Sequence, residues 1–319
     1  MTDRVLVTGG AGFIGSHLAE RLLALGHDVV VLDNESTGFR QNVPAGAEYI
    51  RGDVRNPEDL ERAFALGLEA VFHIAGQAST IRSFGEPLMD LNVNLVGSVN
   101  VIQKCLAHRV PRLLYASSMT AYGNPPGLPI REQMPCQPVS YYGITKYAAE
   151  RFVHATALRN DIDFPFHVTS FRMFNVYGER QRIDNPYQGV MGIFIGNVMR
   201  GEPITIHSDG EQSRDFVYIS DIVDAWIQAW RTPSAYEQVF NLGTGKRHSI
   251  NQLADAVLAA LDKSRESYPV RYIALRPGDQ RHMEADVSKA AQILQWSPRV
   301  DFDEGVKRTV RWASALSEP

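Results

Sequence analysis

The sequence is poor in the residues that build disulfide frameworks and metal centres. Its 319 residues include two cysteines, Cys105 and Cys136, whose separation matches neither a disulfide framework nor a zinc site. The nine histidines include no H-x-x-x-H pair. These shortages exclude a small disulfide-stapled domain. They predict that the protein has no metal centre and works in a reducing cytoplasm.

Long apolar runs and runs of basic residues are also missing. No apolar run approaches about 18 residues, and Met1 is followed almost at once by a strand-like segment instead of a secretory h-region. We therefore expect a soluble, cytoplasmic protein that does not enter a membrane. Lys and Arg total 32 against 36 Asp and Glu, with no basic run interleaved with aromatics, which argues against nucleic-acid binding.

What is present is a large apolar fraction arranged in an alternating pattern. Hydrophobic residues make up 44% of the chain, enough for one large domain or two intimate ones. Short apolar runs alternate with helix-like segments as far as residue 172, which predicts βαβ units. The expected fold is α/β, a Rossmann-type doubly wound parallel sheet with a smaller α/β substrate-binding domain. The runs are RVLVTG, a helix from Phe13, DVVVLD, EYIRGD, AVFHIA, a helix from Pro87 to His108, RLLYASS, a helix near Tyr142, and FHVTSFR.

After Arg172 the pattern breaks into stretches rich in Pro, Gly and Asn, which we assign mainly to a smaller cap. The segment FVYISDIVDAWIQAW is expected to return to the first domain as a strand and a helix. The predicted domains are therefore discontinuous. Residues 1–173 with a return segment at about 215–243 form the first, and residues 174–214 and 244–319 form the second.

A glycine triplet follows the first expected strand. In VTGGAGFIGSH, Gly9, Gly12 and Gly15 stand at G-x-x-G-x-x-G spacing where a helix begins, so the backbone can approach a pyrophosphate at the positive end of that helix. Asp33 closes the second expected strand, where a carboxylate accepts bonds from ribose hydroxyls and repels a 2′-phosphate. The pattern predicts a dinucleotide site that prefers NAD to NADP. The alternative is a tight structural turn and an N-capping aspartate.

The stretch SYYGITKYAAE places two tyrosines before one lysine. Ser140 is a suitable N-cap for a helix that begins near Tyr141, and Tyr142 and Lys146 then share one face at i and i+4 while Tyr141 points elsewhere. A phenol titrates near 10, so acting as a base at about pH 7 requires a shift of roughly 3 pH units, or about 4 kcal/mol. A fixed ammonium contributes to that shift. The alternative is a solvated Tyr/Lys pair on a helix surface.

These motifs and several others occur in one order along essentially the whole chain. They are TGGAGFIGSH, LDN with STG, GDVRN, HIAGQAS, NVNLVGSVN, ASSMTAYG, the Tyr142/Lys146 pair, FRMFNVYG, GEQSRDFVYISD, NLGTG and RPGD. In this respect the chain resembles the extended short-chain dehydrogenase/reductase family. Within that family it resembles the NAD-dependent nucleotide-sugar epimerases and dehydratases, and most of all the UDP-hexose 4-epimerases.

The resemblance implies a set of cofactor contacts. Asp53 and Val54 would lie against the adenine, Asn94 near the nicotinamide side, and Lys146 on the nicotinamide ribose. The implied NAD-binding residues are Gly9, Gly12, Phe13, Ile14, Gly15, Asp33, Asn34, Ser36, Thr37, Gly38, Asp53, Val54, Ala75, Gln77, Asn94, Ser117, Tyr142 and Lys146.

Catalytic and substrate residues follow from the same resemblance. Aligned on the Tyr-Gly ending of ASSMTAYG, Ser118 takes the catalytic Ser/Thr position and joins Tyr142 and Lys146, unless Ser117 and Ser118 only satisfy the backbone of a turn. Dehydratases and decarboxylases of the superfamily carry an acid in the next two positions, which here are Met119 and Thr120. Taken singly, each arginine of the expected substrate site could equally be a solvated surface charge, and Thr80, Arg82 and Met283 could equally only pack or face solvent. The expected substrate-binding residues are Thr80, Arg82, Ser118, Met119, Thr120, Tyr142, Asn175, Arg214, Arg276 and Asp279, with Met283 as a further candidate.

The activity we expect is 4-epimerisation of a UDP-sugar through a transient 4-keto intermediate, with NAD as cofactor. Two alternatives stay open: another 4-keto reaction of nucleotide sugars, by a dehydratase or a reductase, and a catalytically idle NAD-sensing protein on the same fold. The helices around Leu91 to Cys105 and Tyr142 to Leu158 form an intermolecular four-helix bundle in the family, so a homodimer is also expected. The sequence does not identify the sugar.

Overall fold

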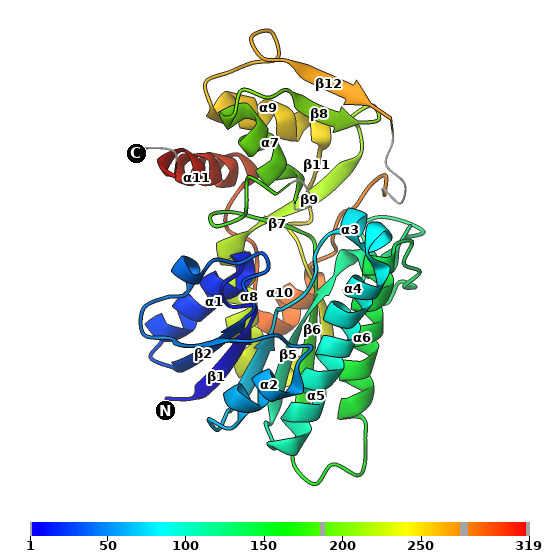
Figure 1. The fold of residues 1–319 in the computed structure, drawn as a ribbon. Helices are drawn as coiled ribbons and strands as arrows, with labels where there is room; N and C mark the ends of the chain where they lie inside the picture. The colour runs from blue at the N-terminus through cyan, green and yellow to red at the C-terminus, as the bar shows by residue number, and fades with distance from the viewer. Residues whose placement is uncertain (1, 186–188, 275–279, 317–319) are drawn as a thin grey trace.

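The computed structural model describes residues 2–185, 189–274 and 280–316. A parallel seven-stranded sheet forms its lower layer in Figure 1, with the strand order β10-β6-β5-β4-β1-β2-β3. The order reverses between β1 and β4, and ligands of open α/β sheets bind at such a point. The expected parallel sheet is confirmed. Its strands are β1 (Arg4–Thr8), β2 (Asp28–Asp33), β3 (Glu48–Arg51), β4 (Ala70–His73), β5 (Arg112–Ser118), β6 (His167–Met173) and β10 (Gln238–Leu242).

Helices cover both faces of this sheet, because its strands are apolar on both sides. In β1, Val5 and Val7 pack into one core cluster while Leu6 packs into the other. The first face carries α1 (Phe13–Ala24) and α8 (Ile219–Arg231), and the second carries α2 (Pro57–Phe64), α5 (Gly97–Ala107) and α6 (Tyr141–Ala157).

The helix expected from Pro87 to His108 is present but interrupted. It consists of α4 (Pro87–Leu91), a π-helical turn η2 (Asn92–Val96) and α5, and the short helix α3 (Thr80–Gly85) precedes it. The π-helical turn widens the helix at Asn94, and such turns often occur at functional sites.

A smaller body lies above the carboxyl ends of the large sheet (Figure 1). It holds a three-stranded sheet of order β11-β9-β7 and a strand pair β12-β8. Its strands are β7 (Asn175–Tyr177), β8 (Ile204–His207), β9 (Ser213–Tyr218), β11 (Arg247–Ser249) and β12 (Val270–Ile273). Its helices are α7 (Val190–Met199), α9 (Ile250–Ala260) and α11 (Phe302–Ala315).

One expected strand has a different partner. FVY belongs to β9, which pairs with β7 and β11 in the small sheet, whereas the helix after it, α8, packs against α1. The strand that returns to the large sheet is β10, beside β6. The helix α10 (Ser288–Leu294) packs against β10 and α8. The proposed division of the chain into domains stays a prediction.

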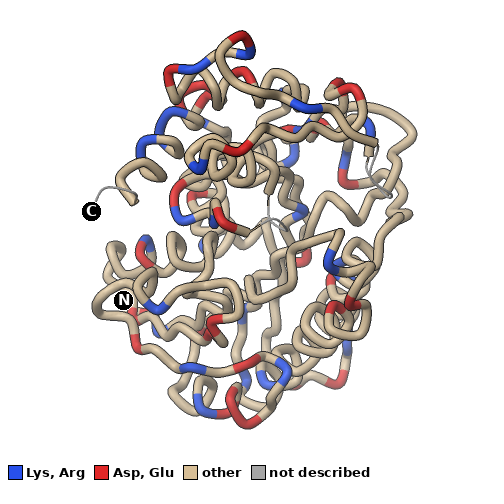
Figure 2. The backbone as a smooth tube through the Cα atoms, turned by 45° about the horizontal axis from the view of Figure 1, so that its top comes forward, with Lys and Arg blue, Asp and Glu red and all other residues tan. Residues whose placement is uncertain are grey.

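The remaining described elements are short 3-10 helices at Arg40–Asn42, Met119–Tyr122 and Pro233–Ala235. Basic and acidic residues are intermixed along the described chain (Figure 2). Among the helices of the described residues, none combines the length and apolarity needed to cross a membrane.

Candidate active site

A cavity of about 1100 Å³ lies at the carboxyl ends of the large sheet, and residues of the smaller body, among them Asn175, Ile193 and Arg214, also line it. Most residues predicted for the site line it. They are Gly9, Gly12, Phe13, Ile14, Gly15, Asp33, Asn34, Ser36, Thr37, Asp53, Val54, Ala75, Gln77, Thr80, Arg82, Ser117, Ser118, Met119, Thr120, Tyr142, Asn175 and Arg214.

Five predicted residues are not in this lining. Gly38, Asn94 and Lys146 are placed directly behind it, while Arg276 and Asp279 lie outside the described residues. Gly38 supports the glycine turn, because a Cβ on Gly38 would come within 2.5 Å of the Ala11 carbonyl carbon. Its contribution is therefore close backbone packing.

The glycine turn leaves room for a ligand at the start of α1. Gly9 has φ +71°, and a Cβ there would lie 2.8 Å from the Ala75 nitrogen; a Cβ on Gly15 would lie 2.1 Å from the Gly9 oxygen. Gly12 caps α1 without a side-chain bond. The first N–H groups of a helix have no partner within it, so this turn presents donors and the positive helix end to the cavity. A pyrophosphate fits such a cradle.

Two carboxylates border the same end of the cavity. Asp33 accepts hydrogen bonds from the Ala11 nitrogen (3.0 Å) and the Glu35 nitrogen (2.7 Å), which leaves lone pairs on both oxygens for further donors. Burial raises the pKa of Asp33, and these backbone bonds oppose that shift. Asp53 accepts from Asn34 (2.8 Å) and from Arg55, whose guanidinium lowers the pKa of Asp53 to about 2. This end of the cavity therefore fits the hydroxyl-rich adenosine half of NAD.

Asn94 organises the opposite end of the cofactor region from behind. Its Oδ1 accepts from the Gln77 nitrogen (2.8 Å), and its Nδ2 donates to the Gln77 oxygen (3.1 Å). The π-helical turn brings this buried amide to the loop after β4. Asn94 thus fixes the backbone that lines the cavity at Gln77.

Of the expected Ser/Tyr/Lys set, Ser118 and Tyr142 line the cavity, and the buried Lys146 lies behind the lining. Ser140 caps α6 through the Gly143 nitrogen (3.1 Å), as predicted, and the helix begins at Tyr141. Ser118 ends β5, where its hydroxyl accepts from Thr120 Oγ1 (2.9 Å) and from the Thr120 nitrogen (3.3 Å). Tyr142 lines the cavity, whereas Tyr141 is exposed and packs its ring against Phe84 at 5.3 Å.

Burial works against the charged forms of both Tyr142 and Lys146. It raises the pKa of Tyr142 to about 12, opposed by a hydrogen bond with Ser118. Burial also lowers the pKa of Lys146 to about 7, opposed by the charges of Asp90 and Glu150. The chain alone therefore does not lower the phenol's pKa as expected, because desolvation outweighs the hydrogen bond with Ser118.

The neighbouring serine has a different environment. Ser117 donates to Glu150 Oε2 (2.7 Å), and Arg172 binds both oxygens of that carboxylate from the next strand, at 3.0 and 2.6 Å. Its hydroxyl is thus committed to a buried network, and any contact of Ser117 with the cofactor would come from other atoms.

The sugar end of the cavity is built from distant segments. Arg82 forms an i,i+4 ion pair with Glu86 at 2.9 Å, and the largely buried Arg214 donates to the Ser213 oxygen (2.8 Å). Met283 is fully buried in a small cluster with Met119, so it packs behind the cavity and does not line it.

Sequence reasoning missed three amides that line the cavity. They are Gln181 and Asn185, on the segment after β7, and Gln280, which lies after β12. The side-chain oxygens of Asn175 and Gln181 are buried and have no hydrogen-bond partner among the described residues, a state that native proteins seldom leave uncompensated. The signal available in the sequence was the position of Gln181, six residues after Asn175 in NVYGERQ.

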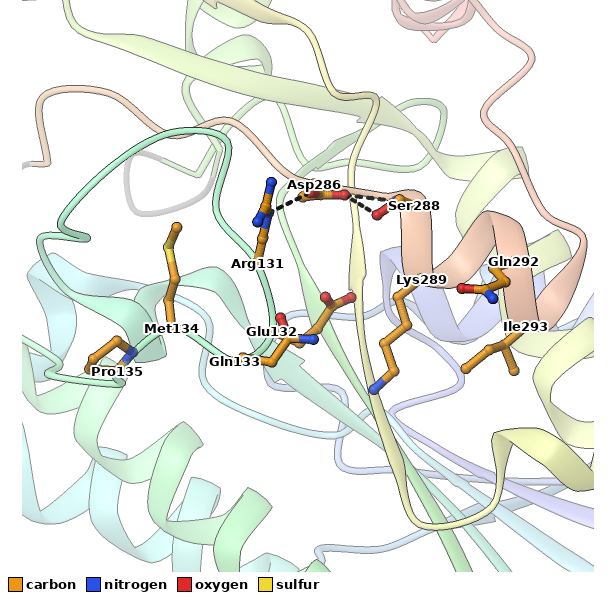
Figure 3. A pocket seen from close by; sticks show the side chains of 10 residues that line it. All are labelled: Arg131, Glu132, Gln133, Met134, Pro135, Asp286, Ser288, Lys289, Gln292 and Ile293. Carbon is orange, nitrogen blue, oxygen red and sulfur yellow. Dashed lines mark hydrogen bonds and ion pairs between the residues drawn. The ribbon is translucent and has the colours of Figure 1, made fainter.

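A second hollow of about 910 Å³ lies between residues 131–135 and α10 (Figure 3). Its charged side chains have partners within the fold: Arg131 pairs with Asp286 at 3.1 Å, and Lys289 donates to the Val239 backbone oxygen at 2.8 Å. The glycine turn and the Ser/Tyr pair lie in the larger cavity, which is therefore the candidate active site.

Comparison with known proteins agrees with this geometry. The NAD dependent epimerase/dehydratase family matches residues 5–243. A UDP-glucose 4-epimerase of Mycolicibacterium smegmatis is 35% identical over 317 residues, which covers 97% of this chain and 98% of that protein. UDP-glucuronic acid decarboxylase 1 of Xenopus tropicalis is 31% identical over 97% of this chain and 72% of that protein.

Two solved structures are similar along the whole fold. UDP-glucose 4-epimerase of Thermotoga maritima with UDP-glucose has a TM-score of 0.90 and 35% identity, over 99% of this chain and all of that one. The Thermus thermophilus UDP-glucose 4-epimerase complex with NAD has a TM-score of 0.89 and 37% identity, over 97% and 98% of the two chains. The glycine turn, the two-layer fold and these full-length likenesses lead to one conclusion: the chain belongs to the NAD-dependent epimerase/dehydratase family.

Proposed function

We propose that this protein is a 4-epimerase of a UDP-sugar, with Ser118, Tyr142 and Lys146 as its catalytic set. The observation that carries the proposal is the turn after Ser118. Met119 and Thr120 stand where elimination or decarboxylation needs an acid, and the Thr120 hydroxyl is bonded to Ser118. The resemblance to 4-epimerases over nearly full length supports the same choice.

The reaction needs few groups. Tyr142 takes the proton from the sugar 4-hydroxyl at its phenolic oxygen, and Ser118 shares that proton and holds the reacting oxygen. NAD, which the glycine turn and Asp33 would hold, would supply a reversible hydride acceptor for C4 of the sugar, and inversion would require the hydride to return to the opposite face of that carbon. Lys146 supports the phenolate from the next turn of α6.

The shifted pKa values of Tyr142 and Lys146 indicate that both residues need nearby positive charge when cofactor and substrate are bound. Burial holds Tyr142 and Lys146 toward their neutral forms, so a proton can move between phenol and sugar at little cost once positive charge adjoins them. Lys146 must keep its proton to provide that charge. Activity therefore depends on the charges around Lys146.

Inversion also requires the sugar to turn while the rest of the substrate stays in place. Arg214 and Asn175 lie at the sugar end of the cavity, and we assign them, with Arg276 and Asp279, to the nucleotide diphosphate. The buried Asn175 oxygen gains a partner when a donor enters the cavity. Met119 and Thr120 border the turning sugar without binding it by charge.

The decisive experiment offers the purified protein UDP-glucose, UDP-N-acetylglucosamine and UDP-glucuronic acid in D2O and follows the products by NMR. We expect inversion at C4 of one of them without added nicotinamide, no deuterium at C5, and NAD released on denaturation. A 4-keto-6-deoxy product, C5 exchange or released CO2 as the main outcome would replace the epimerase assignment by a dehydratase or decarboxylase. Tight NAD binding without turnover of any of these sugars would favour an NAD-sensing protein.

We also propose a homodimer through α3, α4, η2 and α6, which lie side by side in Figure 1. Large apolar side chains of these elements are exposed, and a second copy would bury them in an isologous helix bundle. They are Phe84, Leu88, Leu91, Val96, Tyr141, Ile144 and Phe152.

A further inference from the structure

One buried carboxylate near the catalytic helix has no place in the cavity lining. Asp90, in α4, is fully buried, and its oxygens accept hydrogen bonds from Gln77 Nε2 (2.6 Å), Asn94 Nδ2 (3.0 Å) and Thr145 Oγ1 (2.6 Å). The three donors come from three different parts of the fold: the loop after β4, the π-helical turn and α6. Asp90 therefore joins the cofactor-side backbone to the residue that directly precedes Lys146.

None of these three donors carries a charge. A buried carboxylate is costly unless positive charge compensates it. The other buried acid near Lys146 is Glu150, which Arg172 neutralises with two hydrogen bonds. Asp90 has no such arginine among its bonds, so its charge acts on the buried ammonium of Lys146.

Lys146 lies close to this network. An ideal Cβ on Gly76 would be 3.0 Å from Asn94 Oδ1 and 3.7 Å from Lys146 Nζ, so the amide that Asp90 holds and the ammonium border the same small space. The ammonium also lies 4.5 Å from the centre of the Tyr115 ring. Asp90 is thus connected to the surroundings of Lys146 by two hydrogen bonds, one to Thr145, which precedes Lys146 in the chain, and one to Asn94.

We propose that Asp90 is a positioning residue whose buried carboxylate supplies negative charge beside Lys146 and whose bonds hold Gln77 and Asn94 against α6. The proposal rests on the proposed function in that Lys146 must be charged to assist Tyr142. Asp90 is then the acid whose charge acts on Lys146, because the charge of Glu150 is neutralised by Arg172.

The direction of the pH effect follows from every charged or titratable group that faces Lys146. These are Asp90 from α4, His73 from β4, Tyr115 from β5, Tyr142 and Glu150 from α6, and Arg172 from β6 through Glu150. Burial keeps His73 neutral by lowering its pKa to about 3 and keeps Tyr115 neutral by raising its pKa. Asp90 raises the pKa of both Lys146 and Tyr142, so neutralising Asp90 lowers both values. The bell-shaped pH profile of kcat/KM should therefore move to lower pH as a whole.

Asp90→Asn removes the charge with little change of shape. An amide oxygen can still accept from Gln77 and Asn94, and its nitrogen can donate to Thr145, whose hydroxyl then donates to the Tyr142 carbonyl at 3.1 Å. Thr145→Val is the matched control, because it deletes one bond to Asp90 and keeps the carboxylate. Asp90→Ser is a second neutral variant if the asparagine variant does not fold.

The direct readout is the titration of Lys146 followed by NMR of [13Cε]lysine-labelled protein. The chain has six lysines, and the signal missing from Lys146→Met assigns Lys146. In Asp90→Asn we expect Lys146 to titrate about one pH unit or more lower, and turnover at pH 8 to fall about tenfold. Thr145→Val should leave the Lys146 titration in place.

Two results would overturn the proposal: an unchanged Lys146 titration in both neutral Asp90 variants, or an equal shift in Thr145→Val. Wild-type protein that does not epimerise a UDP-sugar would instead count against the proposed function. The Lys146 titration still tests the effect of Asp90 in that case, so the two failures are distinguishable.

Discussion

The two ends of the cavity are built differently. The cofactor end comes from turns after β1, β2 and β4, and its shape is set by backbone: Gly9 and Gly15 have no room for a side chain. The sugar end comes from segments around residues 80, 119, 175, 181 and 214, and its shape is set by side chains. Two of these side chains, Asn175 and Gln181, have buried oxygens that find no partner within residues 2–185, 189–274 and 280–316.

This contrast indicates that the cofactor end has its binding geometry before ligands bind, whereas the sugar end does not. A backbone cradle at a helix N-terminus is pre-organised, so binding there costs little ordering. Unpartnered amides gain their bonds only when a ligand supplies donors. We therefore expect changes at the cofactor end to act on NAD retention, and changes at the sugar end to act on KM and turnover.

The largest effect is expected at the meeting point of the two ends. Tyr142→Phe should lower turnover at least about a hundredfold, because it removes the general base, while NAD stays bound. Steady-state rates and the NAD released on denaturation measure the two effects. Tyr141→Phe is the control, since Tyr141 is exposed on the outer face, and turnover near the wild-type value in Tyr142→Phe would remove Tyr142 from the mechanism.

The next effect should be confined to the cofactor end. Gly15→Ala places a Cβ about 2.1 Å from the Gly9 oxygen, so the turn must open, and we expect at least about tenfold less NAD in the purified protein. Gly127→Ala is the control, because a Cβ there would meet nothing within 4 Å and Gly127 does not line the cavity. If both variants retain NAD equally, backbone approach does not set the shape of this end.

A smaller effect is expected from the amides of the sugar end. Asn175→Ala and Gln181→Ala should each raise KM about threefold to tenfold with little change in kcat, because each removes a bond made equally in the bound substrate and the transition state. Kinetics with the preferred UDP-sugar measures the effect. An equal loss of kcat would mean that the amide orients the reacting sugar carbon.

The smallest effect on turnover is expected from the exposed face of α6, because Tyr142 and Lys146 lie on the other side of that helix. A double variant Ile144→Glu/Phe152→Glu should convert the dimer into a monomer, because both side chains are exposed on α6 and would carry charge into the proposed interface. Sedimentation at micromolar concentration measures the mass. Leu25→Glu, exposed beyond the end of α1, should leave the mass unchanged, and a monomeric wild type would contradict the proposed interface.

Prediction from the sequence worked best where one short segment contains both the structural and the chemical signal. The glycine turn, the Ser140 cap and the Tyr142/Lys146 spacing are each read within a few residues, and the structure forms the expected turn and helix. It failed for the strand at FVY, since local composition shows a strand but not its partner. Gln181 was missed for the same reason, because its burial in the cavity depends on the path of a loop.

The sequence by itself determined the parallel α/β sheet, the turn that fits a pyrophosphate and the shared face of Tyr142 and Lys146, since hydrophobic period, glycine spacing and helix geometry are local properties. Only the tertiary structure decided the charge environment of that pair. Desolvation and the nearness of Asp90, 56 positions before Lys146 in the chain, come from packing that no short segment encodes. The pKa of a buried group depends on everything folded around it, so the chemistry of the site was settled by long-range contacts.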